Sequence, residues 1–327
     1  MLTFFRRRFK LLSERKATPV NFTYIDLFAG IGGFHQAADA LGGKCLFASE
    51  IDAEAKKAYE ANYHLTPQGD ITKIDAADIP DHDALFAGFP CQPFSIIGAR
   101  RGFDDTRGTL FFEIARILDA KRPRLFILEN VKQLRGHDRG RTFAVILEKL
   151  DALGYNVSWK ILNALDFGLP QKRERMIIVG FRNRLVKFDF PKGEGPGRLQ
   201  DVLENDADID PRFFASDRIR KKRMERHTSE YYPAIWHENK SGNVSSYPYS
   251  CALRAGASYN YLLVNGVRRL TPREMLRLQG FPDSFRIVCT DFQTRKQAGN
   301  AVPVNMIRAV LREALRADAD AEREKSD

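Results

Sequence analysis

The chain has 327 residues, of which 43% are hydrophobic and 29% charged, and no apolar run reaches the ~18 residues of a membrane span, so we expect a cytoplasmic protein of two domains. Four cysteines without CxxC spacing and six scattered histidines argue against a metal site or a disulfide framework. The net charge of +10 indicates nucleic acid as a partner about as strongly as it indicates simple solubility.

Apolar segments of strand length alternate with segments of helical spacing in the first part of the chain. The expected strands are 22–29, 45–49, 84–88, 124–130, 157–164 and 175–181, and the expected helices are 34–41, 54–63, 109–120 and 143–154. This alternation predicts a doubly wound α/β fold, in which helices cover both faces of a parallel sheet. In such a fold, ligands bind beyond the carboxyl ends of the strands.

Chemically informative residues fall at that edge of the predicted sheet. They are the stretch 26–33, Glu50, Asp70, Cys91 and Glu129. Because the carboxyl ends of parallel strands meet at one edge, this co-location indicates a site more strongly than any single motif does.

The sequence GIGG at 30–33 forms a turn that lets the backbone approach a ligand closely. A tight strand-to-helix turn explains it equally well, and His35 stands where the dinucleotide fingerprint needs its third glycine. Glu50 could bind ribose hydroxyls and Asp70 an adenine amino group, although each acid alone is better explained as a helix cap or a turn residue. Together with the glycine turn, the two acids indicate a cofactor that contains adenosine.

A cysteine follows the third predicted strand, in the stretch GFPCQPFS at 88–95. Cys91 stands between Pro90 and Pro93, whose rings restrict the backbone and stiffen the loop. A buried, inert thiol is the simpler explanation of a lone cysteine. A stiff loop at the ligand-binding edge instead favours a nucleophile.

Charged residues at the ends of the later strands bear on this choice. Arg173 and Arg175 are candidate cations for stabilising a Cys91 thiolate. Glu129 caps the following helix or, if it is buried, holds a proton and donates a hydrogen bond. A nucleophile and a carboxyl group beside an adenosine cofactor suggest covalent catalysis with group transfer.

The alternation of strands and helices stops in the second half of the chain. The Pro/Gly-rich stretch 188–198 indicates a domain boundary. The basic cluster 218–226 is explained about equally well by DNA contact and by a solvated face. The stretch 231–266 mixes aromatic and small polar residues, a composition that suits contacts in a DNA groove.

Two helices are predicted near the end of the chain. At 271–281, Thr271 is the expected N-cap, Glu274 closes a capping box and Gly280 ends the helix. A second helix, within 299–317, is expected to pack back on the first domain. The residues after it should fray.

The chain resembles the bacterial DNA (cytosine-5)-methyltransferases over about residues 23–306. The combination of PCQ, ENV and QxRxR in this order is highly specific for that family. The matching motifs are DLFAGIGGF (26–34), GFPCQPFS (88–95), ENV (129–131), QKRER (171–175), RRLTPREMLRLQGFPDSF (268–285) and QAGNAVP (297–303). The resemblance implies a Rossmann-like methyltransferase sheet with a second, smaller target-recognition domain.

The resemblance also implies the chemistry and the catalytic residues. Cys91 would add to C6 of cytosine, and Glu129 would engage N3 and the exocyclic amine. Arg175 would hold the O2 side of the base, whereas Arg173 would support the loop or the backbone. C5 would then attack the methyl group of S-adenosyl-L-methionine, and the target base must first be flipped out of the duplex.

A cofactor pocket is implied in the same way. It comprises Phe28, Gly30, Gly33, Glu50, Ile51, Asp70, Ile71, Pro90, Leu110 and Asn300. Ile51 replaces an aromatic residue that the family often has, so aliphatic packing would replace one stacking contact with adenine. The stretch 95–108, with three glycines and three arginines, resembles a mobile lid, although composition alone suggests a solvated loop.

We therefore expect an S-adenosylmethionine-binding catalytic domain at 1–187, a target-recognition domain at 188–290 and a segment at 291–327 that returns to the catalytic domain. The enzyme would act on double-stranded DNA as a monomer. It would be linked functionally to a cognate restriction endonuclease and would protect host DNA in a restriction–modification system.

Three other functions remain open. The size of the segment 188–290 argues against an RNA cytosine methyltransferase on the same scaffold. Intact Cys91, Glu129 and Arg175 argue against a DNA-binding regulator with a dead active site. His35 argues against a dinucleotide-dependent oxidoreductase.

Overall fold

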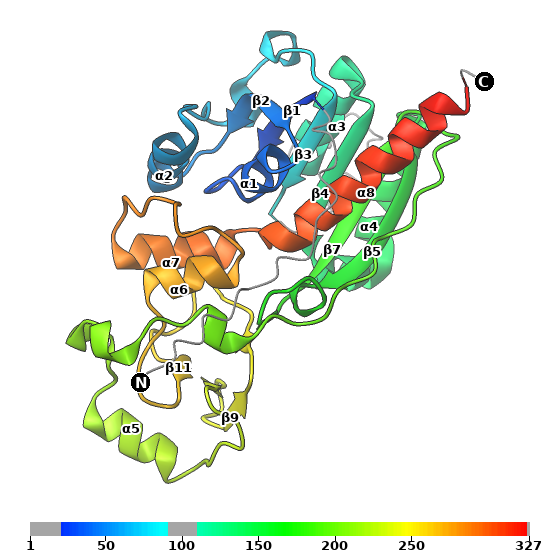
Figure 1. Cartoon of the computed structure of the whole chain (residues 1–327). Helices are drawn as coiled ribbons and strands as arrows, with labels where there is room; N and C mark the ends of the chain where they lie inside the picture. Colours follow the sequence, from blue (N-terminus) through cyan, green and yellow to red (C-terminus); the bar gives the residue numbers. More distant parts are fainter. Residues whose placement is uncertain (1–20, 91–109, 326–327) are drawn as a thin grey trace, which may run out of the picture.

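The computed structural model describes residues 21–90 and 110–325 (Figure 1). Cys91 and the predicted lid at 95–108 lie outside these ranges. No helix within the described ranges is long and apolar enough to cross a membrane.

The larger part of the molecule is a six-stranded sheet between two layers of helices (Figure 1). The strand order is β2-β1-β3-β4-β7-β5. The strands are β1 (Phe22–Leu27), β2 (Gly43–Ser49), β3 (Ala84–Gly88), β4 (Leu125–Val131), β5 (Asn156–Asn163) and β7 (Glu174–Phe181), and the first four helices are α1 (Gly33–Asp39), α2 (Ala53–Tyr63), α3 (Leu110–Lys121) and α4 (Arg141–Ala152).

Alternate residues of the central strands point to opposite faces of this sheet. In β4, Leu125 and Ile127 pack in the cluster that contains α1 and α8, whereas Phe126 and Leu128 pack in the cluster that contains α3 and α4. Both faces are covered, so the strand reads as an unbroken apolar run rather than as an alternating one. The predicted doubly wound fold is confirmed.

The expectation that every strand is parallel is wrong for β7. This strand is antiparallel to both of its neighbours, β4 and β5. The chain between β5 and β7 contains no crossover α-helix, only the short 3₁₀ turn Ala164–Asp166 and the strand β6 (Gln171–Lys172). A connection without a crossover helix returns the chain beside the strand it has just left, which gives antiparallel pairing.

The C-terminal helix α8 (Val304–Arg323) is longer than predicted, so the expectation of a frayed tail is wrong. Ala317 and Ala321 are buried in the core that α8 shares with α1. Asp318 is also buried and forms an ion pair with Arg124. The buried stripe of the helix therefore continues into a stretch whose composition looks like a solvated tail.

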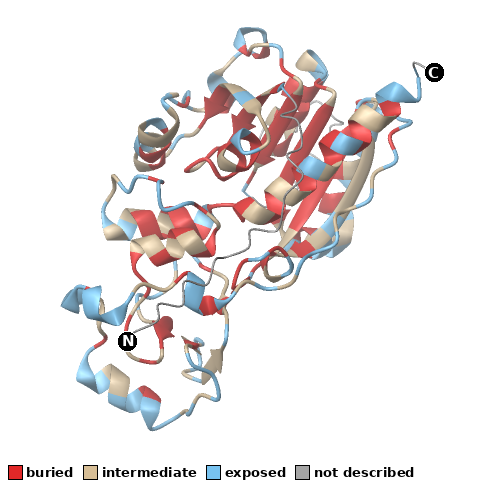
Figure 2. Ribbon diagram, in the orientation of Figure 1, coloured by how far each residue is buried: buried red, intermediate tan, exposed pale blue. Residues whose placement is uncertain are grey.

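The smaller part of the molecule contains short elements and much irregular chain (Figure 1). A three-stranded antiparallel sheet has the order β11-β8-β9. Figure 2 shows buried residues along the strands of the large sheet and mostly exposed residues around α5. The elements of this part are α5 (Asp217–Met224), β8 (Ile235–Glu238), β9 (Val244–Tyr247), β10 (Ser250–Cys251), β11 (Leu262–Val264) and α6 (Pro272–Leu278). Helix α7 (Asp291–Asn300) packs beside α6 and leads into α8.

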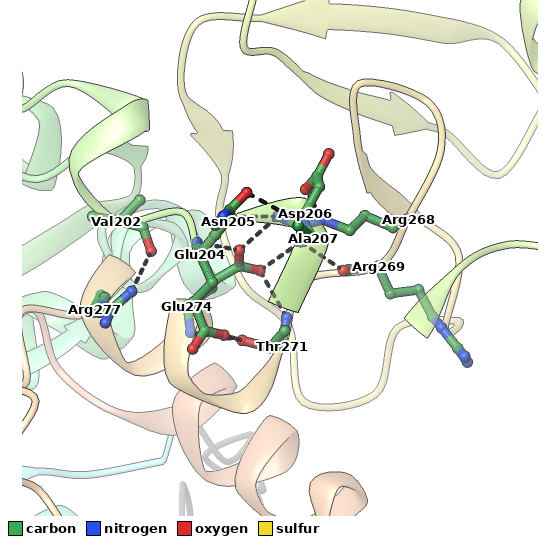
Figure 3. A network of polar contacts seen from close by, with 10 residues as sticks. All are labelled: Val202, Glu204, Asn205, Asp206, Ala207, Arg268, Arg269, Thr271, Glu274 and Arg277. Atoms are coloured by element: carbon green, nitrogen blue, oxygen red, sulfur yellow. Dashed lines mark hydrogen bonds and ion pairs between the residues drawn. The ribbon is translucent and has the colours of Figure 1, made fainter. Parts of the chain in front are cut away.

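A buried arginine organises the start of α6 (Figure 3). Arg268 is 1% exposed, and its guanidinium donates to both carboxylate oxygens of Glu274, at 2.9 and 2.8 Å, and to Asp206 at 2.6 Å. Glu274 also completes the predicted capping box with Thr271. Gly280, with φ of 85°, follows the helix as predicted. The network joins three segments of the small part around one guanidinium.

Candidate active site

One cavity of about 400 Å³ lies at the carboxyl ends of β1, β2, β3 and β4. It is lined by every predicted site residue that the structure describes. These are Phe28, Gly30, Gly33, Glu50, Ile51, Asp70, Ile71, Pro90, Leu110, Glu129, Arg173, Arg175 and Asn300. Within the described ranges, no group of three or more His, Cys, Asp or Glu side chains could hold a metal ion.

At the rim of this cavity, Glu50 links the turn that follows β1 to the turn that follows β2. One carboxylate oxygen accepts from the Gly30 N–H at 2.8 Å, and the other accepts from the Ile51 and Asp52 N–H groups at 2.8 Å each. The carboxylate is thereby fixed in place, and its remaining lone pairs are open to hydroxyl donors. Ile51 is 76% exposed at the rim, where its side chain could pack against an aromatic ring.

The turn after β1 has an unusual backbone. Phe28 has φ of 56°, which is rare for a residue with a side chain, and Gly30 has the same φ. A Cβ at Gly33 would lie 2.6 Å from Val302 Cγ2, so only glycine lets α1 begin this close to the segment after α7. Strained backbone of this kind concentrates at ligand-binding sites.

Asp70 serves as the cap that the simpler interpretation predicts, and it also lines the cavity. Its carboxylate accepts from the Thr72 N–H at 3.1 Å and from the Thr72 hydroxyl at 2.8 Å. These hydrogen bonds hold the pKa of Asp70 below its usual value. The carboxylate therefore stays ionised at the rim, able to accept a further hydrogen bond.

Glu129 and Arg175 form a buried ion pair in the cavity wall. The distance between Glu129 Oε1 and Arg175 Nε is 2.7 Å, and the two side chains are 10% and 15% exposed. Burial raises the pKa of Glu129 above its usual value, although Arg175 and Arg173 oppose the shift. In the pairing of β3 with β4, Glu129 stands opposite Gly88, two residues before Pro90.

Arg173 acts on the backbone around the cavity. Its guanidinium donates to the carbonyl oxygens of Leu253 at 3.0 Å, Gly299 at 2.9 Å and Ala301 at 2.8 Å. Burial, with the nearby charge of Arg175, lowers the pKa of Arg173 to about 9. These contacts make Arg173 a positioning residue that ties the large sheet to the loop before Arg254 and to the segment around Asn300.

Sequence reasoning missed the role of Asn130, although the ENV motif contains it. The Asn130 side chain is buried, donates to the Phe89 carbonyl at 2.9 Å and accepts from the Val131 N–H at 2.8 Å. Phe89 lies just before Pro90, where the described part of the cysteine loop ends. Asn130 thus fixes the base of that loop to the strand that carries Glu129.

A second missed feature is a buried acid beneath the glycine turn. Asp26 is fully buried, and neither carboxylate oxygen accepts a hydrogen bond from another side chain among the described residues. Desolvation, followed by the charge of Glu50, raises the pKa of Asp26 well above its usual value. His35 lies nearby, with its ring nitrogens 2.6 Å from the Tyr59 hydroxyl and 3.1 Å from Asp39. The signal in the sequence is an acid at the end of an apolar strand.

Comparisons with known proteins identify the family. The family of C-5 cytosine-specific DNA methylases matches residues 22–316. The chain is 58% identical over 287 residues to type II methyltransferase M.NgoBI of Neisseria gonorrhoeae, covering 87% of this chain and 90% of the relative. It is 37% identical over 316 residues to M.HhaI of Haemophilus parahaemolyticus, covering 91% and 95%. The chain therefore belongs to the C-5 cytosine-specific DNA methylase family and is a DNA cytosine-C5 methyltransferase.

The fold is also found in solved structures. The crystal structure of S. pombe Dnmt2 methyltransferase matches with a TM-score of 0.67 over 90% of this chain and 98% of that one. At 20% sequence identity, this likeness concerns the fold alone.

Proposed function

We propose that this enzyme methylates C5 of a cytosine within a specific sequence of double-stranded DNA, using S-adenosyl-L-methionine. The target base is flipped out of the duplex, and Cys91 adds covalently to its C6. The enzyme acts as a monomer in the cytoplasm. Residues 1–187 and 291–327 form the catalytic domain, and residues 188–290 read the DNA.

The observation that carries the proposal is the meeting of three groups at one cavity. The buried Glu129–Arg175 pair, the strained turn at Phe28 and the end of the loop that leads to Cys91 all lie in its wall. A neutral ring that is attacked by a nucleophile develops negative charge. A carboxyl group with a raised pKa can donate a proton to that ring, and a neighbouring guanidinium can donate hydrogen bonds to it.

The cavity fits the proposed cofactor. Its acids, Glu50 and Asp70, suit ribose hydroxyls and an adenine amino group, and they favour a ligand that carries positive charge. Apolar side chains of Phe28, Ile51 and Ile71 line the same wall and suit the adenine ring. The volume of about 400 Å³ lies within the range of cofactor sites, which is roughly 300–1,000 Å³. When bound, S-adenosylmethionine supplies an electrophilic methyl group.

The chain's own residues divide the remaining chemistry among them. The Cys91 thiolate forms a bond to C6, and the displaced electron pair makes C5 nucleophilic. Glu129, in its protonated form, gives its proton to N3 as negative charge develops there, while Arg175 binds O2. After C5 is methylated, solvent water takes the C5 proton, the C6–S bond breaks to release the Cys91 thiolate, and N3 returns its proton to Glu129, which restores the aromatic ring. Flipping the base costs a few kcal/mol.

The curated relatives support the biological setting. M.NgoBI and M.HhaI are named type II methyltransferases, a name that belongs to restriction–modification systems. We accordingly infer that this enzyme protects host DNA against a cognate restriction endonuclease.

A methyl-transfer assay on two polymers tests the proposal. Purified enzyme with labelled S-adenosylmethionine should transfer the label to duplex DNA and not to RNA of the same sequence. Sequencing of 5-methylcytosine in a host that expresses the gene should then give one short recognition site. Label found only in RNA, or no label in either polymer, would contradict the proposal.

A further inference from the structure

A hollow in the small part of the molecule lies outside the catalytic cavity. It opens between the turn that joins β8 to β9 and the loop that precedes Tyr261. Asn239, Lys240, Arg254 and Ser258 contribute polar groups to its lining. These are the amide, ammonium, guanidinium and hydroxyl groups with which proteins contact base edges and phosphates.

Arg254 is the exposed arginine of this hollow. Its side chain donates no hydrogen bond and forms no ion pair with any residue that the structure describes. The nearby acid Glu238 is already paired with Arg223, at 2.9 Å. The guanidinium carbon of Arg254 lies over the Tyr261 ring, 4.8 Å from its centre, so the fork is oriented while its donors stay available.

The backbone beside Arg254 is fixed relative to the catalytic cavity. Leu253 accepts from Arg173 at 3.0 Å, and its N–H donates to the Gln171 side chain at 3.0 Å. On the other side of Arg254, Ala255 N would lie 2.4 Å from a Cβ at Gly299, next to Asn300. The guanidinium therefore stands in a defined place with respect to the cavity that receives the target base.

A second arginine fixes the loop between Arg254 and Tyr261. Arg295 is buried, and its guanidinium donates to the Ser258 carbonyl at 3.0 Å and to the Ala257 carbonyl. The Tyr261 hydroxyl accepts from the Arg254 N–H at 3.1 Å. A side chain that distinguishes one base from another has to be held in one orientation, because a mobile guanidinium could form hydrogen bonds with several different bases.

We propose that Arg254 determines specificity by reading a guanine in the major groove of the recognition site. Guanine offers O6 and N7 as adjacent acceptors, which match the two parallel donors of a guanidinium. This inference rests on the proposed function, because it assumes that residues 188–290 bind the duplex beside the catalytic cavity.

A phosphate contact is the alternative for an exposed arginine, and α5 supplies better candidates for that role. Arg218, Lys221 and Lys222 are exposed on this helix and have no partner among the described residues. Buried Arg223 fastens the helix to Glu238, beside the hollow. Exposed cations on the surface of a helix suit contacts with backbone phosphates. Arg254 instead lines a hollow, and its guanidinium donors have a defined orientation.

The test uses the recognition site, once it has been mapped, with each guanine replaced singly by 7-deazaguanine, which lacks the N7 acceptor. For the wild-type enzyme, one replacement should lower kcat/KM for duplex DNA by about 5- to 150-fold. Arg254→Lys keeps the charge and removes the fork. This variant should be slower on the natural site by a similar factor and should lose its sensitivity at that one guanine.

The double variant Lys221→Gln/Lys222→Gln is the matched control. It should weaken binding to every duplex equally and should retain the wild-type sensitivity to 7-deazaguanine. The dependence of log K on log salt should fall by about one for each phosphate that the protein no longer neutralises. A wild-type enzyme that tolerates 7-deazaguanine at every position would overturn the inference. So would an Arg254→Lys variant that keeps the full sensitivity.

These outcomes are distinct from failure of the proposed function. If the wild-type enzyme methylates no DNA, the proposed function itself is wrong. If it methylates a defined site and Arg254→Lys changes only the salt dependence, Arg254 contacts a phosphate and the inference alone is wrong.

Discussion

The large and the small part of the molecule are each stabilised internally by a different kind of contact. The catalytic cavity stands at the end of strands such as β3 and β4, whose side chains are almost all apolar and buried. In the small part, the buried arginines Arg223 and Arg268 hold short strands and loops by hydrogen bonds to carboxylates and carbonyls, and Arg295 of α7 holds the loop before Tyr261 in the same way. Arg173 reaches across between the two parts.

The difference bears on how each part does its work. A close-packed sheet keeps catalytic groups in fixed positions, because apolar packing leaves the strands few alternative arrangements. In the small part, guanidinium groups instead fix irregular loops by hydrogen bonds to individual carbonyl oxygens and carboxylates.

Replacing the proposed nucleophile should have the largest effect. Cys91→Ser should lower the rate of methyl transfer by at least about 10³-fold, since the hydroxyl is a far weaker nucleophile than the thiolate. Affinity for the specific duplex, measured by fluorescence anisotropy, should stay near that of the wild-type enzyme. Robust turnover by this variant would contradict the assignment.

Glu129→Gln should slow single-turnover methyl transfer by about 10²- to 10⁴-fold, the range typical of a general acid. Burial raises the pKa of Glu129, so its proton is retained at higher pH than usual and is lost as pH rises through that raised value. The wild-type rate should therefore fall on the alkaline side. The amide does not titrate, so the variant's pH–rate profile should lack this fall. Unchanged rates, with unchanged cofactor affinity, would remove Glu129 from the mechanism.

The small part should depend strongly on its buried guanidinium. Arg268→Ala leaves the carboxylate of Glu274, fully buried, without its bidentate partner, and should lower the free energy of unfolding by about 3–5 kcal/mol. Arg198→Ala is the control, because Arg198 pairs with Asp201 at 2.7 Å on the exposed surface. Urea denaturation of the two variants should separate them clearly, and equal losses would show that burial is not what matters.

The last effect, which appears only as a dependence on pH, should come from the buried acid beneath the glycine turn. The folded protein raises the pKa of Asp26, so it favours the protonated form. Stability from this source is present below the ordinary Asp pKa and is lost as pH rises through the raised value, by at most about 1.4 kcal/mol per pH unit. Asp26→Asn should abolish this loss. Denaturation at pH 5 and pH 8 measures the difference, and parallel pH profiles for the two proteins would contradict it.

Much of the large sheet could be predicted because its signal is local. Apolar runs between turn residues gave each strand and helix to within two residues at either end, and the capping box of α6 is visible from Thr271 and Glu274 alone. The direction of β7 was mispredicted, because a parallel and an antiparallel buried strand have the same apolar pattern.

The rest depends on partners that are distant in the sequence. Arg173 donates to the carbonyl oxygens of Leu253 and Gly299. Every residue has a backbone carbonyl group, so the sequence does not show which residues accept these hydrogen bonds. The length of α8 is underestimated for a related reason, since the buried Asp318 pairs with Arg124, a residue distant in the sequence. The cavity residues were found through motifs, whereas the contacts that hold them in place required the fold.

The transient bond between the Cys91 sulfur and cytosine C6 is the central claim. A duplex that carries 5-fluorocytosine in the mapped site, incubated with enzyme and S-adenosylmethionine, should trap that bond, because fluorine cannot leave C5 as a proton does. Peptide mass spectrometry should then find the DNA adduct on Cys91, with none on the Cys91→Ser variant. A wild-type enzyme that methylates the natural site and yet forms no adduct, or forms it on another residue, would contradict the account.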